Sequence, residues 1–576
     1  MPEAFLALGP FLEELEARLR ALAPDDLRAA LLAHGERLTA RERKAFLAIF
    51  ADARPEAEVE PRGAEQPLLA EIEALVERLR AGAYVEGWGW DPDLHEERAF
   101  GDESWAWEMD GLFAVAAQAF LEGDLKLARE AYGQLLRALL LDEEGAFSGP
   151  GPAAEMLETD VSEAKARYLR TVYETTVLPE RAAGVAAELA ALGSVGGATP
   201  LRSLGETRRD KLPDLAAFLR GWIELLAADG EGLGAEGLRL LIEAVRLQRG
   251  SAGLADLARE RGARHPEIYL AWVDALGAED AAAACREALE RLEPHGEVLA
   301  QIAERLALLA EREEDGDAVL EARRAAWRAA PSTERLLTLL DTATALGVAD
   351  EALATEADLA ERAGMPGSDR LACELLLLGG RVEAALGLLR AASPLGWSSR
   401  GHSGPVVVPY LLAAACGAAP PGADTPVLAE QFRDMDREGW YSAAFSLSAL
   451  DAPRSDPDDP EHRSGEPRLA AALGRRLASQ ALDDEAGERW LAAARTKVEE
   501  RTAAVVETKH RGAYERVARL VVACAEAIAL AQGAPKGGAL VSDLRERYPR
   551  HSAFQAELDR AVRRSPLLPP PPRRRK

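Results

Sequence analysis

FLEGDLKLAREAYGQLLRAL, residues 120–139, carries the pattern that decides the fold. Gly123 follows an apolar stretch, Ala128 comes five residues later and Tyr132 nine residues later. Glycine often ends a helix because it adopts left-handed backbone angles at little cost. The small alanine lets the next helix approach closely, and the larger tyrosine one turn later fills the groove between the two. The stretch therefore predicts two helices packed against each other.

The same spacing recurs in LLGGRVEAALGLLRAASP, residues 377–394, with Gly379, Ala384 and Leu388 at the three positions. Elsewhere Leu, Ile and Val recur every three or four residues with charged residues between them, which is typical of amphipathic helices. Examples are FLEELEARLRAL (11–22), LLAEIEALVERLRAG (68–82) and LAQIAERLALLAERE (299–313). Alternating strand patterns are nearly absent. We therefore predict an all-α chain of paired helices.

The glycine, alanine and aromatic spacing resembles the tetratricopeptide repeat (TPR) pattern, although the terminal proline of that pattern is missing at residue 140. GDAVLEARRAAWRAAPSTERLLTLLDTA (316–343) resembles the helical repeats that accompany SWIM zinc fingers in large bacterial proteins, as do residues 490–533 and 545–562. The finger itself, C-x-C followed by C-x-H, is absent from the sequence. These resemblances imply an α-solenoid of degenerate TPR-like helical hairpins, in which each pair buries its apolar side against its neighbours and the stack presents a groove.

Breaks in the helical pattern divide the chain into segments. Polar stretches rich in proline and glycine, such as DAPRSDPDDPEHRSGEP, mark the links. The predicted segments are an N-terminal helical unit (1–55), a linker (56–66), helical repeats (67–192) with a Trp- and acid-rich insert (84–110), a central helical-repeat array (193–450), a disordered linker (451–467), basic C-terminal helical repeats (468–565) and a disordered Pro/Arg tail (566–576).

The charge is strongly negative and unevenly spread. The chain of 576 residues has a formal net charge of −28, whereas residues 491–576 hold 18 Lys+Arg against 9 Asp+Glu, a net of +9 that leaves −37 for residues 1–490. An acidic body repels nucleic acid and anionic membranes. The four cysteines form no C-x-x-C pair, and the longest apolar run, 405–419, is too short to span a bilayer. We therefore predict an acidic, cytoplasmic, bacterial protein that does not engage a membrane.

The insert AYVEGWGWDPDLHEERAFGDESWAWEMD is the most unusual stretch. Between Tyr84 and Asp110 it holds nine carboxylates, four of the ten tryptophans and one strong base, Arg98. A calcium loop would need glycine where Glu96 stands, and H-E-x-x-H would need histidine where Ala99 stands. Three interpretations stay open: a loop that packs helical layers, a groove for a peptide, or a metal or catalytic site.

The favoured hypothesis is a non-catalytic interaction scaffold that holds a protein or peptide partner, with a basic segment as the expected ligand. No catalytic residue, metal ligand or cofactor is assigned. Glu155 and Glu158 are expected as an i, i+3 pair on one face of a helix that adds to the site. The candidate binding residues are Trp88, Trp90, Asp91, Asp93, His95, Glu96, Glu97, Asp102, Glu103, Trp105, Glu155 and Glu158.

Two alternatives remain. The insert could make the chain an enzyme or a metal-binding protein, which metal analysis of the purified protein would test. The basic C-terminal unit could contact nucleic acid or another anion, although the −37 body opposes tight binding. A gel shift that survives deletion of 566–576 and mutation of the basic residues would disprove that alternative. These residues are Lys509, His510, Arg511, Arg550 and His551.

Overall fold

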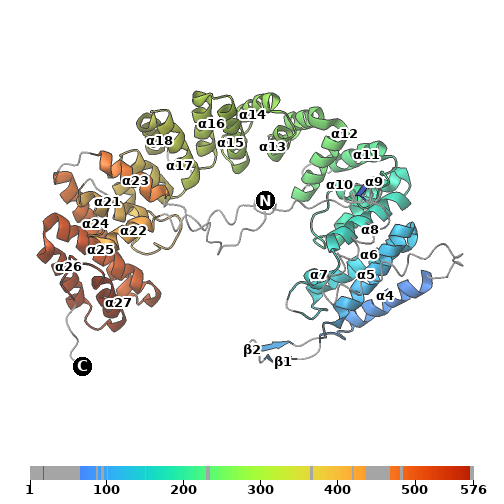
Figure 1. Ribbon diagram of the computed structural model, residues 1–576, viewed down its shortest axis with the longest axis horizontal. Coiled ribbons are helices and arrows are strands. Elements are labelled where there is room, and N and C mark those ends of the chain that lie inside the picture. The colour runs from blue at the N-terminus through green and yellow to red at the C-terminus, as the bar shows by residue number, and fades with distance from the viewer. Residues whose placement is uncertain are drawn as a thin grey trace. The chain divides into compact units, whose positions relative to one another are not determined.

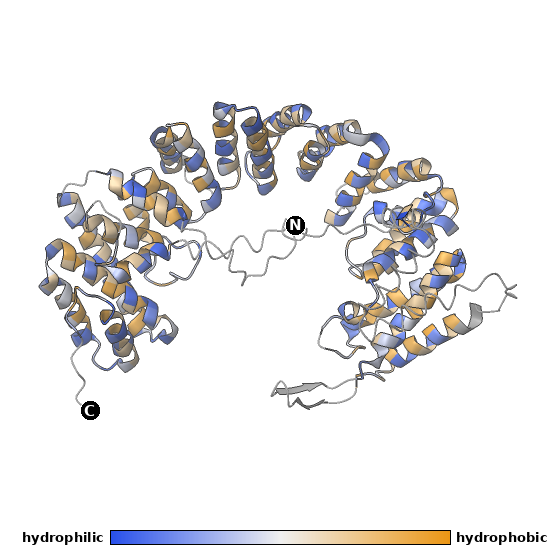
Figure 2. Cartoon of the chain, in the orientation of Figure 1, coloured by the Kyte–Doolittle hydropathy of each residue, from blue (hydrophilic) through white to orange (hydrophobic). Residues whose placement is uncertain are grey.

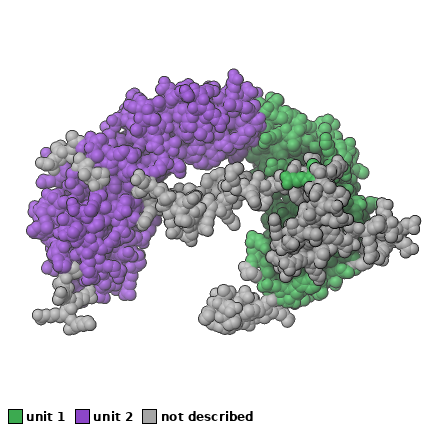
Figure 3. Space-filling model, viewed as in Figure 1, with its two compact units in different colours: residues 1–257 green, residues 258–576 purple. Residues whose placement is uncertain are grey.

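The computed structural model places the chain in two compact units, unit 1 (residues 1–257) and unit 2 (residues 258–576), shown in different colours in Figure 3. The structure describes residues 17–18, 65–85, 88–91, 96–99, 102–149, 151–228, 234–363, 367–417, 421–435, 468–480 and 484–570. Helices dominate both units, so the all-α prediction is confirmed.

Unit 1 is a stack of helices that follow one another in chain order (Figure 1). Helix α4 packs on α5 and α6, α5 packs on α6 and α8, and α8 packs on α9. Contacts with the next helix and the next but one are the mark of a solenoid. The elements are α4 (Glu65–Arg80), β1 (Trp88–Asp91), β2 (Glu96–Ala99), α5 (Ser104–Glu122), α6 (Leu125–Ala138), the 3-10 helix η1 (Leu139–Glu144), α7 (Ala153–Met156), α8 (Val161–Thr175), α9 (Leu178–Leu192), α10 (Leu201–Glu206), α11 (Leu215–Ala228) and α12 (Ala235–Arg261).

One β-hairpin lies within the predicted insert. Strands β1 and β2 pair antiparallel, with Trp88 opposite Ala99 and Trp90 opposite Glu97. This is the only sheet in the part of the chain that the structure describes. A single two-stranded hairpin leaves the α-helical class of the protein unchanged.

Unit 2 continues the same kind of stacking and ends in a bundle. Helices α13 to α20 pack in order, α23 returns to pack on α17 and α19, and α25 contacts α21, α22, α24, α26 and α27. The elements are α13 (Glu267–Asp274), α14 (Ala278–Arg291), α15 (Glu297–Arg312), α16 (Gly316–Ala329), α17 (Thr333–Ala345), α18 (Ala349–Ala363), α19 (Asp369–Leu378), α20 (Val382–Ala391), α21 (Gly404–Ala415), α22 (Pro426–Arg433), α23 (Arg468–Ser479), α24 (Asp484–Glu507), η6 (Arg511–Ala513), α25 (Tyr514–Gln532), α26 (Ala534–Arg547) and α27 (Ser552–Val562).

Ion pairs in unit 2 join helices that are two apart in the stack. Arg305 of α15 donates to Asp274 of α13 at 2.6 Å, and Arg335 of α17 donates to Glu304 of α15 at 2.7 Å. Each ion pair spans 31 residues of sequence. Ion pairs at or near the surface contribute only about 0–1 kcal/mol each, so apolar burial remains the main stabilising term of the stack.

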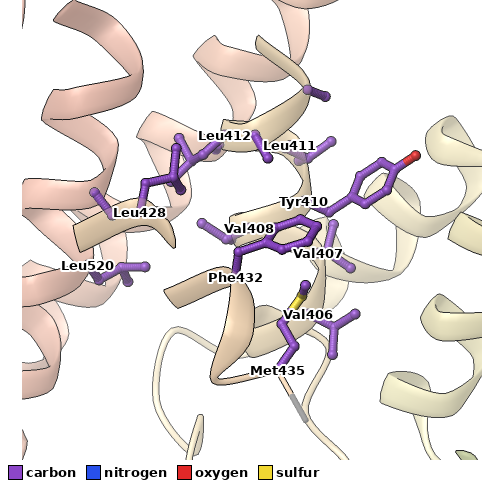
Figure 4. Close-up of a cluster of buried hydrophobic side chains, with 14 of the residues drawn as sticks. Val406, Val407, Val408, Tyr410, Leu411, Leu412, Leu428, Phe432, Met435 and Leu520 are labelled. Atoms are coloured by element: carbon purple, nitrogen blue, oxygen red, sulfur yellow. The ribbon is translucent and has the colours of Figure 1, made fainter. Parts of the chain in front are cut away.

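The apolar core of unit 2 is thickest around α21 and α25. Figure 4 shows Val406 and Val408 of α21 beside Phe432 of α22 and Met435, with Leu520 of α25 close to this cluster. All five side chains are buried. Helices nearer the surface are amphipathic, with hydrophobic and hydrophilic residues on different sides, as Figure 2 shows. Burial of the apolar sides is the main stabilising term in such a stack.

The helix pair predicted at 120–139 is confirmed. Gly123 ends α5 with a left-handed φ of 92°, and Ala128 and Tyr132 of α6 are buried, 0% and 1% exposed. The second copy of the spacing is shifted by one residue. Gly380, with φ 74°, makes the left-handed turn, and the buried residues of α20 lie one place after the predicted ones. In this degenerate repeat the glycine turn and the buried side of the second helix are kept, but both are shifted by one residue from the predicted positions.

The stretch 193–200, where the central array was expected to begin, is packed within unit 1. Val195 and Thr199 are buried there, and the Lys165 ammonium donates to the carbonyl oxygens of Gly193 and Gly197 at 3.3 and 2.8 Å. The division between the units falls inside α12 instead. Segments 1–55, apart from residues 17 and 18, and 451–467 lie outside the described residues, so their predicted nature stays a prediction.

The first residues of the segment 566–576, which was expected to be disordered, are packed on unit 2, and residues 571–576 lie outside the described residues. Leu568 is buried, 6% exposed, in the core of unit 2, and the ring of Pro569 lies against Gly538 of α26. The proline run indicated an extended chain, but two leucines before it supply apolar side chains that pack on α26 and α27.

Candidate binding site on helices α5, α6 and α8

Helix α5 is apolar on two opposite sides. No charged residue stands between Gly111 and Leu121, and one side is buried through Trp105, Met109 and Phe113. The other side faces solvent: Trp107 is 73% exposed, Val115 50% and Leu121 57%. A helix that is apolar all round is normally buried all round. We call the exposed side the α5 apolar face; its residues are Trp107, Gly111, Ala114, Val115, Gln118 and Leu121.

Helix α4 does not cover this face. It packs through a single stripe, Leu68, Ile72, Leu75 and Leu79, and its remaining surface carries exposed charged residues. The α5 apolar face is therefore left without a packing partner among the described residues.

Hydrogen bonds fix the start of α5. The Asp102 carboxylate accepts from the Ser104 amide at 2.8 Å. Hydrogen bonding by the Ser104 hydroxyl, and next by this amide, lowers the pKa of Asp102. The Tyr84 hydroxyl donates to Glu108 at 3.1 Å, and Arg78 forms an ion pair with the same carboxylate. Burial raises the pKa of Tyr84, and the adjacent Glu108 raises it further. These contacts hold the first turn of α5, and with it Trp107, in place.

Asp110 of α5 positions the beginning of α8. Its carboxylate accepts from the amides of Glu158 and Thr159 at 3.0 and 2.9 Å, and from the Thr159 hydroxyl at 2.6 Å. Asp160 then caps α8 by accepting from the Glu163 amide at 3.0 Å. Two carboxylates thus bring the acidic stretch before α8 beside the first turns of α5.

The expectation that Glu155 and Glu158 share one helix face is wrong. Helix α7 ends at Met156, and Leu157 is extended, with φ −78° and ψ 145°, so the two glutamates lie in different local structures. A four-residue helix flanked by glycines and prolines is too short to present an i, i+3 pair as one surface. Both side chains are nonetheless exposed, and the amide of Glu158 is bonded to Asp110 of α5.

A cavity of about 210 Å³ lies between α5, α6 and α8. Tyr132 of α6 lines it with an exposed fraction of only 1%, and its hydroxyl has no hydrogen-bond partner. The Nε of Arg167 is likewise buried without a partner, while another nitrogen of the same guanidinium pairs with Glu163 at 2.5 Å. The cavity is lined by Phe113, Ala114, Ala117, Tyr132, Thr159, Asp160, Glu163, Ala164 and Arg167.

The electrostatics of this cavity are set by burial and by Arg167. Burial raises the pKa of the Tyr132 hydroxyl, and the nearby Arg167 guanidinium offsets part of that rise. The two groups lie close enough for hydrogen bonding by Arg167 to lower the pKa of Tyr132, although the pair falls outside strict hydrogen-bond geometry. Tyr132 therefore stays a neutral phenol near neutral pH and can both donate and accept a hydrogen bond.

The surroundings of the α5 apolar face are acidic. Residues 99–125 hold six acidic residues and residues 138–164 hold seven, and neither segment contains a lysine or an arginine. Glu103 lies one helical turn before Trp107, and Glu158 is held beside α5 by Asp110. We call the exposed carboxylates around this end of α5 the acidic rim; they are Asp102, Glu103, Glu155, Glu158 and Asp160.

The residues predicted from the insert differ in exposure, and some of them lie outside the described residues. Trp105 is wrong as a binding residue, because it is 0% exposed, donates to the Ser148 carbonyl at 3.0 Å and packs on Phe147. Asp102 and Glu103 are exposed in the acidic rim. Asp93 and His95 lie outside the described residues, and only the backbone is described for Trp88, Trp90, Asp91, Glu96 and Glu97.

Trp107 is the residue that the sequence reasoning missed. It is not among the candidate binding residues predicted from the sequence, yet its exposed fraction is 73%. Two residues along a helix turn the side chain by about 200°, so Trp105 and Trp107 cannot both face the core. A helical wheel of residues 104–122 could have indicated the exposure of Trp107, because apolar residues lie on two opposite sides of the helix and only one side can face the core.

The structure brings the predicted basic residues of unit 2 to one place. The Tyr548 hydroxyl donates to Glu507 at 3.2 Å, which sets the turn that follows α24 beside the end of α26. Lys509, His510 and Arg511 follow Glu507, and Arg550 and His551 follow Tyr548. All are exposed except His551, which is partly covered beside the Tyr548 ring. Their contact with nucleic acid or another anion stays a prediction.

Within the described residues no group of three or more His, Cys, Asp or Glu side chains is arranged to hold a metal ion. No helix in the same part of the chain is both long enough and apolar enough to cross a membrane. The metal hypothesis for the insert is not tested by this result, because Asp93 and His95 are not described.

No family model matches the chain, and no curated protein matches it. Among solved structures it is similar to the pentatricopeptide repeat protein PPR10 from maize, with 14% identity, 94% of this chain and 71% of that chain covered, and a TM-score of 0.23. It is also similar to a circular tandem repeat protein with a novel repeat topology, with 16% identity, 87% and 98% covered, and a TM-score of 0.16. TM-scores this low carry no functional argument, and the expected kinship with SWIM-associated repeats finds no support among these matches. The chain is a helical-repeat protein by the packing of its own helices.

Proposed function

We propose that this protein is a non-catalytic scaffold that binds a basic, amphipathic segment of a partner protein on the α5 apolar face, inside the acidic rim. The observation that carries the proposal is the exposure of Trp107, at 73%, on a helix face with no packing partner among the described residues. Exposed apolar faces rimmed by polar residues mark interaction sites, and tryptophan is the residue most enriched among binding hot spots.

The geometry of the face favours a helical ligand. Trp107, Ala114 and Leu121 recur every seven residues along α5, with Gly111 and Gln118 between them. A helix of 19 residues is about 28 Å long, enough to pair with about five turns of a partner helix. Gly111 and Ala114 are small, so a second helix can approach closely between the larger side chains.

The charge of the rim favours a basic ligand. The carboxylates of the acidic rim lie at the N-terminal end of the α5 apolar face, so a segment with lysines or arginines beside its apolar residues matches both features. Rim charges act mainly on the association rate and are screened by salt. Binding is therefore expected to weaken as ionic strength rises, and Glu103→Lys with Glu158→Lys is expected to remove most of that salt dependence.

The proposal can be tested with a random peptide library displayed on phage, selected against the full chain. Leu121→Asp places a charge on the α5 apolar face, and Leu530→Asp makes the same change near the end of α25. The two leucines are matched controls because they are 57% and 45% exposed on helices of equal length. Selected peptides should bind the Leu530→Asp protein as they bind the unchanged protein, and should bind Leu121→Asp and Trp107→Ala about thirtyfold more weakly.

One result of this selection would contradict the proposed function. If selection yields only peptides that bind the Leu121→Asp and Trp107→Ala proteins as well as the unchanged chain, the α5 apolar face is not a binding surface. Melting temperatures of the three variants check that each is folded. Substitutions at exposed positions are expected to change stability by less than about 0.5 kcal/mol.

A further inference from the structure

Two turns of unit 2 that are far apart in the sequence lie side by side. One turn follows α24 and the other joins α26 to α27, and the Tyr548 hydroxyl of the second donates to Glu507, the last residue of α24, at 3.2 Å. Segments 507–516 and 545–551 hold six lysines and arginines against three glutamates, in a chain whose formal net charge is −28. We call the basic side chains of the two turns the basic turn patch; they are Lys509, His510, Arg511, Arg547, Arg550 and His551.

The fold does not use the main cations of this patch. Arg545 of α26 and Arg564, which follows α27, each form an ion pair with a carboxylate, at 2.7 and 2.6 Å. Lys509, Arg511 and Arg550 are exposed, and none of the three forms an ion pair within the described part of the chain. An acidic chain offers many carboxylates for pairing, so cations left together on two adjacent turns are available to a partner.

Lys509 has a backbone conformation that is unfavourable for lysine. Its φ is 60°, and only three non-glycine residues of the described chain have a positive φ. The amides of Lys509 and His510 donate to the carbonyl oxygens of Val506 and Val505, at 3.2 and 3.0 Å. These two bonds form a common helix ending in which the left-handed residue is usually glycine. A local cost that persists at an exposed position points to a function of the side chain there.

The surface around these cations favours a phosphate backbone over a protein as the partner. A protein interface normally has an apolar centre rich in aromatic residues. Tyr514 and Tyr548, the aromatic residues of the two segments besides histidine, are each only 4% exposed, and Pro549 is the one exposed apolar side chain there. Interfaces with nucleic acid are more polar and strongly positive. With no exposed Phe, Tyr or Trp to stack on an unpaired base, the patch suits the backbone of a duplex better than a single strand.

We infer that the basic turn patch binds the phosphate backbone of a nucleic-acid duplex, independently of the base sequence. An arginine guanidinium suits a phosphate because it can donate two parallel hydrogen bonds. The acidic body opposes this binding, but repulsion between exposed charges is largely screened beyond about 10 Å at 0.1 M salt. The patch belongs to unit 2 and the α5 apolar face to unit 1, so the inference does not rest on the proposed function.

Fluorescence anisotropy of short labelled DNA and RNA duplexes, titrated with the full chain at several salt concentrations, tests the inference. Three phosphate contacts would weaken binding about fortyfold between about 50 and 200 mM salt. Arg511→Gln and Arg550→Gln should each weaken binding about threefold and lower the slope of log affinity against log salt by about 0.9. Lys536→Gln, at the opposite end of α26, removes an equally exposed cation and should change neither value.

Lys509→Gly separates binding from folding. Glycine adopts left-handed angles at little cost, so this variant is expected to melt at or above the temperature of the unchanged protein while binding the duplex about threefold more weakly. Binding to DNA alone or to RNA alone supports the inference and identifies the source of the phosphates.

Four results would overturn the inference. The first is that neither duplex binds at about 50 mM salt, where the electrostatic contribution is large. The second is that the Lys509, Arg511 and Arg550 variants bind as the unchanged protein does. The third is that binding is lost only when residues 571–576 are removed, which would assign it to the basic tail. The fourth is that polyglutamate competes as well as the duplex at equal charge, which would indicate an acidic protein partner.

Discussion

Helices α5 and α25 have the same length, 19 residues, and similarly apolar sequences, yet they occupy opposite environments. Helix α25 lies among five other helices, and every residue from Leu520 to Ala529 is buried. Helix α5 is covered on one side only and exposes Trp107, Val115 and Leu121 on the other. The comparison shows that apolar composition alone does not place a helix in the core. An apolar helix with too few neighbours is a candidate for binding something else.

The largest expected difference in stability comes from making the same substitution, leucine to alanine, in each of the two helices. Leu520→Ala in α25 removes a side chain that is 3% exposed, whereas Leu121→Ala in α5 removes one that is 57% exposed. We expect the first to lower the free energy of unfolding by about 2–5 kcal/mol, because it leaves a cavity, and the second by less than about 0.5 kcal/mol. Urea denaturation of both variants measures the difference. Equal losses would mean that the α5 apolar face is packed in the folded protein.

A smaller effect concerns Glu526, a carboxylate buried within α25. It is 0% exposed, accepts from the Leu428 amide at 2.9 Å, and burial raises its pKa above the ordinary value of 4.5. A raised pKa means that the folded state holds the proton more tightly than the unfolded state. The stabilisation from this group is thus full below about pH 4.5 and is lost as the pH rises through the folded-state pKa.

Glu526→Gln is expected to remove that pH dependence, because an amide does not titrate in this range. The stability difference between the two proteins should change by at most about 1.4 kcal/mol per pH unit above pH 4.5, with the unchanged protein losing more. Unfolding measured at several pH values gives the two slopes. Parallel curves would show that Glu526 ionises as freely as an exposed glutamate and that α25 is less enclosed than described.

Much of the fold could be predicted from the sequence because helical periodicity and glycine spacing are local signals. The pair at 120–139 follows from Gly123, Ala128 and Tyr132, and all three lie as expected. The division inside α12 could not be predicted, because it depends on which helices pack together and not on a local break. The burial of Leu568 beyond the last helix was missed for the same reason.

The candidate site was predicted only in part. The acidic rim includes Asp102, Glu103, Glu155 and Glu158, which the density of carboxylates had indicated. Trp105 was chosen as a binding candidate and Trp107 was left out, because counting aromatic residues does not say which side of a helix each one occupies. The cavity at Tyr132 and Arg167 joins residues 35 apart from different helices, so only the tertiary structure could reveal it.

The central claim is that the α5 apolar face is open in the folded chain and covered when a ligand binds. Hydroxyl-radical footprinting of the full-length protein, read by tandem mass spectrometry, tests this most directly, because Trp105 and Trp107 lie on one peptide and serve as internal references. The account predicts rapid oxidation of Trp107 and slow oxidation of Trp105 in the free protein, and protection of Trp107 when a selected peptide is added. Equal protection of both tryptophans in the free, dilute protein would contradict it.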